Sequence, residues 1–167
     1  SSAASDVYKR QIESPDLWSP ETPSLYLVKT TLVDPKSGKL LDEKNHKVGF
    51  RWFTFDGSKG FFLNGKSYKL RGLNRHQDQA PAGVALDDEA HRRDIFLMKE
   101  LGCNFIRISH FPQDDAILEM CDELGLLAWE EIPIINIVPN TPGYDDNCEY
   151  NLREMIRQHY NHSSCLL

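Results

Sequence analysis

From Tyr68 to Tyr160 the sequence alternates between short runs of strand-forming residues and longer stretches with helical spacing. The predicted strands cover residues 68–74, 105–109 and 126–129, and the predicted helices cover 88–101, 114–124 and 146–160. Successive strand–helix units of this kind form neighbouring parallel strands, with the helices packed outside the sheet. Three such units cannot close a barrel or cover both faces of the strands. We therefore expect an incomplete α/β fold over this part of the chain.

Two of the predicted helices begin and end at residues that suit helix termini. Asp87 or Asp88 precedes the first helix and Asp114 precedes the second. An aspartate at this position accepts hydrogen bonds from the free backbone N–H groups of the first turn. Gly102 and Gly125 follow the same two helices, where glycine tolerates the left-handed backbone that ends a helix. These positions predict the limits of both helices.

The first part of the chain has a β pattern instead. Strand-forming residues at 25–33 stop at a turn over 34–38, and further strand runs extend to Phe55. Asn64 and Gly65 lie between two more short strand runs, and both residue types tolerate the positive φ that a two-residue hairpin requires. After this hairpin the pattern is expected to change from all-β to alternating strands and helices.

The composition limits the classes of partner. The 167 residues include 19 Lys and Arg against 25 Asp and Glu, a net charge of −6, and the cations form no stripe. Nucleic-acid binding needs clustered cations, so we expect no nucleic-acid partner. No apolar run approaches the roughly 20 residues of a membrane helix, so we expect no membrane partner. Four widely spaced cysteines predict neither a disulfide framework nor a zinc site.

Both ends of the chain differ from the rest. Residues 1–11 have no periodicity and lack the apolar core of a signal peptide. Residues 6–11 and 165–167 resemble translated copies of a transposon end used in sequencing libraries. We therefore expect residues 1–11 and 165–167 to lie outside the fold, and the natural protein to be longer at both ends. The sequence leaves both a bacterial cytoplasmic and a periplasmic location open.

Several motifs follow one another in the order found in a known enzyme family. Residues 104–112 (NFIRISHFP) and 121–126 (CDELGL) resemble the first signature of glycoside hydrolase family 2. Residues 71–78 (RGLNRHQD) are similar to the run that leads into the barrel of that family, and residues 17–26 (LWSPETPSLY) are similar to its preceding immunoglobulin-like sandwich. The motifs occur in the right order along the chain.

This resemblance implies a fold and a domain boundary. Residues 12–58 are expected to form the C-terminal part of an immunoglobulin-like β-sandwich. Residues 59–164 are expected to form the first three β/α units of a (β/α)8 TIM barrel, which is incomplete in this chain.

The resemblance also implies a retaining β-glycosidase. The runs at 74–78 and 129–133 are most similar to bacterial β-galactosidases, with β-glucuronidase and β-mannosidase of the same family as alternatives. The family's nucleophile and acid/base glutamates lie beyond Ser164, so the chain alone is expected to be inactive. A non-catalytic carbohydrate-binding homologue is the rival hypothesis. The expected partner is a carbohydrate substrate, and a homo-oligomeric full-length protein stays open.

The ends of the predicted strands carry the candidate substrate-binding residues. His76 ends the first strand and His110 the second, and the carboxyl ends of barrel strands form the catalytic face. A neutral imidazole both donates and accepts hydrogen bonds, which suits hydroxyl recognition. Asp78 matches a carboxylate that glucuronidases of the family use against sugar hydroxyls. The other four histidines are expected on the surface: His46, His91, His159 and His162.

Arg107 and Glu131 are expected to support the site without touching the sugar. The resemblance implies that the charge of Arg107 keeps the missing nucleophile ionised, since a nearby cation lowers the pKa of a carboxyl group. Glu130 and Glu131 are adjacent on a strand and point to opposite faces, so they are not the two convergent carboxyl groups of retaining hydrolysis. The family's magnesium ligand aligns with Ile135, whose apolar side chain binds no hard cation, so we expect no metal or other cofactor.

Overall fold

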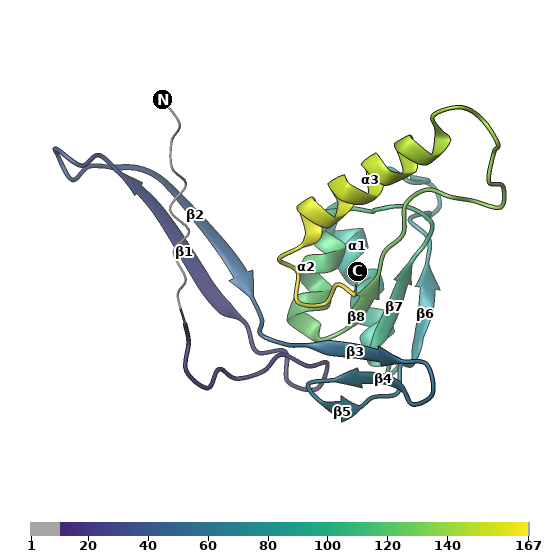
Figure 1. Cartoon of the computed structure of the whole chain (residues 1–167), viewed down its shortest axis with the longest axis horizontal. Helices are drawn as coiled ribbons and strands as arrows, with labels where there is room; N and C mark the ends of the chain where they lie inside the picture. Colours follow the sequence, from purple (N-terminus) through teal and green to yellow (C-terminus); the bar gives the residue numbers. More distant parts are fainter. Residues whose placement is uncertain (1–10, 167) are drawn as a thin grey trace.

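The computed structural model describes residues 11–166, whose strands form three separate sheets. The strands are β1 (Tyr26–Val33), β2 (Leu40–Val48), β3 (Phe53–Asp56), β4 (Gly60–Leu63), β5 (Lys66–Ser67), β6 (Gly72–Arg75), β7 (Phe105–Ile108) and β8 (Leu127–Trp129). The helices are α1 (Asp88–Glu100), α2 (Asp115–Leu124) and α3 (Tyr144–His159). In Figure 1 the β1–β2 hairpin projects away from a body that holds the other elements.

The β1–β2 hairpin is antiparallel, with Tyr26 opposite Val48. Its turn confirms the predicted break after β1: the Asp34 carboxylate accepts hydrogen bonds from the backbone N–H groups of Lys36 and Ser37. Leu27 and Val28 point to opposite faces of the hairpin, and both are exposed. The described residues therefore supply no second sheet to cover either face of this β segment.

The second sheet, β3–β4–β5, is also antiparallel. Asn64 and Gly65 join β4 to β5 with φ values of 49° and 78°, which confirms the predicted two-residue hairpin. Phe61 and Leu63 of β4 are buried. They belong to a core that also contains Trp18 from the N-terminal segment and Leu127 of β8. This core joins the β segment to the α/β segment.

The third sheet is parallel, in the order β6–β7–β8. Its buried side chains pack with those of α1 and α2 in one core: Ile95, Met98, Ile106, Ile108, Ile117, Leu118, Cys121, Leu126 and Ala128. The expected change from all-β to parallel α/β structure is thereby confirmed. None of the helices in the described part of the chain has the length and apolar character to cross a membrane.

The strand expected over residues 68–74 is shorter in the structure, where β6 begins at Gly72. Just before β6, the backbone forms hydrogen bonds with the Asn104 side chain in place of a neighbouring strand. The Asn104 side chain accepts from the Arg71 N–H at 2.7 Å and donates to the Lys69 carbonyl at 3.0 Å. A Cβ atom on Gly72 would lie 1.9 Å from the Phe105 carbonyl oxygen, so this close approach of β6 to β7 requires glycine.

The helix termini agree with the predicted ones. The side chains of Asp87 and Asp114 accept from backbone N–H groups in the first turns of α1 and α2. Gly125 ends α2 with φ of 76°, and Gly102 follows α1 with φ of 85°. The third helix begins at Tyr144, two residues before the predicted start.

The expectation that residues 165–167 lie outside the fold is wrong for Cys165 and Leu166, which are buried. This segment runs parallel to β8: the Ala128 N–H donates to the Ser164 carbonyl, and the Leu166 N–H donates to the Ala128 carbonyl, both at 2.8 Å. Leu166 packs in the same core as Trp18. Residues 1–10 and 167 lie outside the described part of the chain.

Candidate functional site

The carboxyl ends of β6, β7 and β8 lie at one edge of the parallel sheet. The register places Asn74 opposite Arg107 and Arg107 opposite Trp129, so these three side chains share the face that does not carry the helix-packed core. Trp129 is half exposed on that face. His76 directly follows β6, and His110 lies two residues after β7, so both predicted histidines lie at this edge.

Arg107, His110 and Glu131 form one contact group. The Arg107 Nη2 atom lies 2.7 Å from Glu131 Oε1 and 3.2 Å from His110 Nδ1. His110 Nδ1 is 3.7 Å from the same carboxylate oxygen. All three side chains are partly exposed, at 33%, 32% and 24% for Arg107, His110 and Glu131. They are therefore held in place and still open to a ligand.

The contact with Arg107 determines which ring nitrogen of His110 carries the proton. A guanidinium group only donates, so His110 Nδ1 accepts and the proton of the neutral ring lies on Nε2. His110 then presents an N–H donor on the other side of its ring. The His76 ring lies next to it, with 5.2 Å between ring centroids in an edge-to-face arrangement.

Asp78 is the one predicted substrate-binding residue that the structure does not bring into this group. It lies in the loop after His76, is exposed, and makes no hydrogen bond or ion pair with residues 11–166. Its assignment stays a prediction.

Glu130 and Glu131 diverge, as expected from their adjacent positions. Glu131 points to Arg107, whereas Glu130 is buried against His159 Nδ1 at 2.7 Å. The Cys165 thiol also donates to Glu130, and burial raises the pKa of that thiol. Neither glutamate is free to form a convergent pair.

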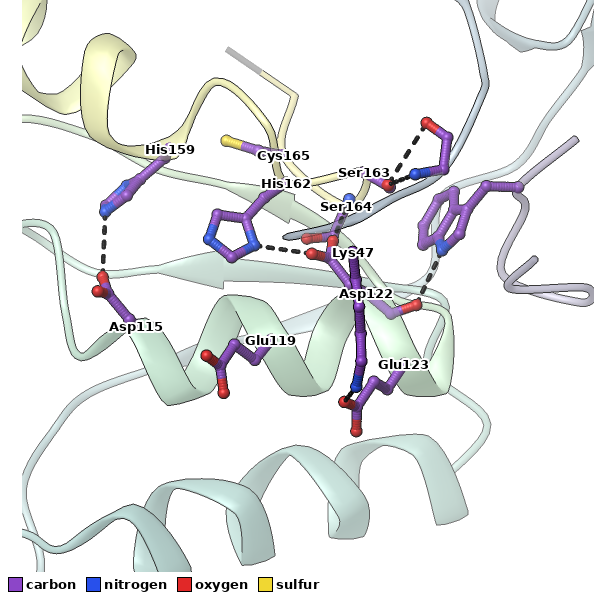
Figure 2. A network of polar contacts seen from close by, with 12 residues as sticks. Lys47, Asp115, Glu119, Asp122, Glu123, His159, His162, Ser163, Ser164 and Cys165 are labelled. Atoms are coloured by element: carbon purple, nitrogen blue, oxygen red, sulfur yellow. Dashed lines mark hydrogen bonds and ion pairs between the residues drawn. The ribbon is translucent and has the colours of Figure 1, made fainter. Parts of the chain in front are cut away.

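The expectation of a surface position is wrong for His159, which is buried at the C-terminal end of α3. Its Nδ1 atom contacts Glu130, and its Nε2 atom lies 3.5 Å from Asp115 Oδ1 (Figure 2). The hydrogen bond with Glu130 raises the pKa of His159 above 6.5, although burial opposes this. Two carboxylates facing the two ring nitrogens favour the protonated imidazole.

Two further histidines are also less exposed than expected. His91 of α1 is 1% exposed, and its Nδ1 atom lies 2.9 Å from Arg75 Nη2. His162 is partly buried, and its Nδ1 atom lies 2.7 Å from Asp122 Oδ2 (Figure 2). Arg75 lies on a strand and Asp122 on a helix, both distant in the sequence from these histidines. The residues around His91 and His162 in the sequence therefore did not predict their burial. His46 is exposed on β2, as expected.

Asp122 also joins the β segment to the α/β segment. Its carbonyl accepts from the Trp18 indole N–H at 2.8 Å, and its Oδ1 atom accepts from the Ser164 N–H at 2.7 Å. Lys47 of β2 pairs with Glu123 at 2.7 Å (Figure 2). These contacts hold the base of the hairpin against α2.

A polar cavity of about 370 Å³ lies between β2, α2 and the end of α3. It is lined by Asn45, His46, Lys47, Glu119, Asp122, Glu123, Gln158, Asn161 and His162. None of the residues at the strand ends lines it. We assign the functional site to the strand ends because polar side chains from three strands converge there.

No metal site is evident in residues 11–166, which contain no group of three or more side chains able to hold a metal ion. Ile135, which the resemblance aligned with a magnesium ligand, is exposed in the loop after β8. The absence of a cofactor stays a prediction.

Comparisons with known proteins agree with this architecture. The family model for the TIM barrel domain of glycosyl hydrolases family 2 matches residues 56–167, and a second model described as glycosyl hydrolases family 2 matches residues 1–51. The crystal structure of Bacteroides uniformis β-glucuronidase is 73% identical, with a TM-score of 0.87, and the match covers 91% of this chain and 18% of that chain.

Two curated relatives have different activities in their names. A putative β-glucuronidase of Formosa agariphila is 40% identical over 96% of this chain and 19% of its own length. A β-galactosidase of Thermoanaerobacterium thermosulfurigenes is 42% identical over 99% of this chain and 23% of its own length. The chain therefore spans between 18% and 23% of the length of these proteins. With a family model matching residues 56–167, the chain belongs to glycoside hydrolase family 2 and contains the start of its TIM barrel domain.

Proposed function

We propose that this chain supplies part of the sugar-binding wall of a retaining β-glycosidase that hydrolyses β-glucuronides. The observation that carries the proposal is the group formed by Arg107, His110 and Glu131 beside His76, at the carboxyl ends of three parallel strands. In a TIM barrel this edge is the catalytic face. We take β6, β7 and β8 as the first three of the eight barrel strands.

The chemistry of retaining hydrolysis explains which part of the site lies here. It needs two carboxyl groups about 5 Å apart, one as nucleophile and one as acid/base. Glu131 is held by Arg107, and Glu130 is buried against His159, so neither takes these roles. The reacting glutamates come from later strands, and the chain alone has no glycosidase activity in this proposal.

His110 and His76 recognise sugar hydroxyls. The Nε2–H group of His110 donates to a hydroxyl while its Nδ1 atom accepts from Arg107. The ion pair with Glu131 balances the charge of Arg107, so this part of the wall suits neutral hydroxyl groups. Arg107 and Glu131 hold His110 in place without contacting the sugar themselves.

The choice of sugar rests on the relatives. The sequence motifs favoured a β-galactosidase, whereas 73% identity to a β-glucuronidase of Bacteroides uniformis supports a β-glucuronide. The 42% identity to a β-galactosidase supports the second candidate, a β-galactoside. The barrel segment is similar in both groups, so residues outside this chain make the choice.

The test uses the complete reading frame that contains this chain, expressed and assayed on nitrophenyl β-glucuronide and β-galactoside. We expect an Asn-Glu pair soon after the described residues and a higher kcat/KM for the glucuronide. A higher value for the galactoside would support the second candidate instead. Sugar binding without turnover, in a protein that lacks the Asn-Glu pair, would support the non-catalytic rival.

Residue roles are tested in a grafted enzyme, in which residues 11–166 replace the matching segment of the Bacteroides uniformis β-glucuronidase. We expect the grafted enzyme to hydrolyse nitrophenyl β-glucuronide. An inactive graft that is folded would contradict the proposed role of this segment.

A further inference from the structure

Gln113 lies in the segment between β7 and α2, and its side chain contacts the ends of two strands. Its Nε2 group donates to the Ser109 carbonyl at 2.8 Å and to the Arg75 carbonyl at 3.3 Å. Its Oε1 atom accepts from Arg75 Nη1 at 2.6 Å. One amide side chain thus joins the end of β6 to the segment that follows β7.

The orientation of this amide is determined by its partners. The Arg75 guanidinium only donates, so it must face the amide oxygen. The two carbonyl groups only accept, so they must face the amide nitrogen. Position 113 therefore needs a side chain that both donates and accepts, and glutamine meets this requirement where glutamate does not.

Arg75, which donates to Gln113, is itself held in place by α1. Its side chain is 4% exposed and contacts α1 twice: it forms an ion pair with Asp94 at 2.9 Å, and its Nη2 atom lies 2.9 Å from His91 Nδ1. Because Arg75 is buried and held from two sides, Gln113 is anchored to the helical layer. Movement of the strand ends would break these hydrogen bonds.

The two carbonyl groups that Gln113 holds directly precede the two histidines of the site. The Arg75 carbonyl belongs to the peptide bond to His76, and the Ser109 carbonyl belongs to the peptide bond to His110. We propose that Gln113 is a positioning residue that sets the separation of the His76 and His110 rings. Its consequence for catalysis rests on the proposed function, but the geometric role does not.

The geometric role is tested in the 167-residue chain by NMR of its histidine ring signals. Gln113→Glu keeps the shape and the acceptor for Arg75, but places an oxygen against two carbonyl oxygens. Gln113→Met removes both the hydrogen-bond donor and the acceptor, with a side chain of similar length. We expect both variants to shift the ring signals of His76 and His110 and to leave those of His46 in place. Gln158→Glu, the same change at an exposed site on α3, should leave the signals of His76 and His110 unchanged.

The catalytic consequence is tested in the grafted enzyme. We expect Gln113→Glu and Gln113→Met to lower kcat ten- to a hundredfold, because small misplacements of groups that contact the transition state are costly. KM should change less than threefold, since these contacts strengthen only in the transition state. A loss of folding alone would lower the amount of active enzyme and the activity at all substrate levels, without shifting the histidine signals of the folded fraction.

The two proposals fail in different ways. Unchanged signals of His76 and His110 in both variants of Gln113 would overturn the positioning role, whatever the activity of the graft. Shifted signals with an inactive unmutated graft would support the positioning role and overturn the proposed function. Shifted signals with an unchanged kcat would overturn the catalytic consequence.

Discussion

Arg107 and Glu131 form an ion pair of 2.7 Å between neighbouring strand ends of the parallel sheet. Arg107 lies on β7, and Glu131 follows the last residue of β8 by two positions. The same guanidinium contacts His110 Nδ1 at 3.2 Å. The pair therefore connects the loop after β8 to the histidine that we assign to the sugar, and it leaves this part of the site without net charge.

Glu131→Gln should lower kcat/KM of the grafted enzyme about tenfold, which is about 1.4 kcal/mol. The guanidinium of Arg107 then loses its carboxylate partner, and its contact with His110 Nδ1 changes as a result. The free energy of unfolding should change by less than about 1 kcal/mol, because both side chains keep contact with water. Glu154→Gln is the matched control, since it breaks the exposed pair with Arg157 on α3. An equal loss of kcat/KM in both variants would contradict a specific role for Glu131.

The free energy of unfolding of the chain should depend on pH through His159. Its pKa is raised in the folded state, chiefly by the hydrogen bond with Glu130, so protonation of His159 stabilises the fold. This contribution is complete below the ordinary value of 6.5 and is lost as the pH rises through the higher folded-state value. Denaturant titrations at a series of pH values should show stability falling over that range.

His159→Gln provides the comparison. It should lower stability by about 1.5–3 kcal/mol at pH 6, since a hydrogen bond to a charged group is lost, and by less at pH 8. His46→Gln, at an exposed position on β2, should leave the pH dependence unchanged. A pH dependence that persists in His159→Gln would mean that another group is responsible.

Local features of the fold were predictable from the sequence because their causes are local. The aspartates that begin α1 and α2 contact N–H groups two or three residues away, and Gly125 adopts the backbone that ends α2. The Asn64-Gly65 turn joins adjacent strands. The meeting of His76 and His110 was also predictable, because parallel strands bring their carboxyl ends together.

Features that depend on distant partners were not predictable. His91 and His159 looked like surface residues, but Arg75 and Glu130 reach them from strand ends and allow their burial. Gln113 carried no sign of its role, since its contacts depend on the spacing of two strands. Leu166 is buried only because the last residues align beside Ala128 of β8, a pairing of segments far apart in the chain.

Leu166→Ala should lower the free energy of unfolding by about 2–3 kcal/mol, as expected for a buried leucine that leaves a cavity. Leu166 is 8% exposed and packs in the core of Trp18 and Leu127. Leu101→Ala, at a position that is 74% exposed, should cost less than about 0.5 kcal/mol. Equal values in a denaturant titration would show that Leu166 does not belong to the core.

His110→Ala tests the placement of the sugar most directly. Hydroxyl contacts strengthen as the sugar ring approaches its oxocarbenium-like transition state, so removing one should lower both kcat and kcat/KM. We expect the loss to be about 2–4 kcal/mol of transition-state stabilisation, or about 30- to 1000-fold. His91 is unsuitable as a control, because it is buried against Arg75. The exposed His46 takes its place.

The decisive measurement is therefore kcat and kcat/KM of the grafted enzyme on nitrophenyl β-glucuronide, for His110→Ala beside His46→Ala. We predict the loss stated above for His110→Ala, with an unchanged thermal midpoint, and kinetic values within twofold of the unmutated graft for His46→Ala. A near-normal kcat in His110→Ala would contradict a sugar-binding site at the carboxyl ends of β6, β7 and β8.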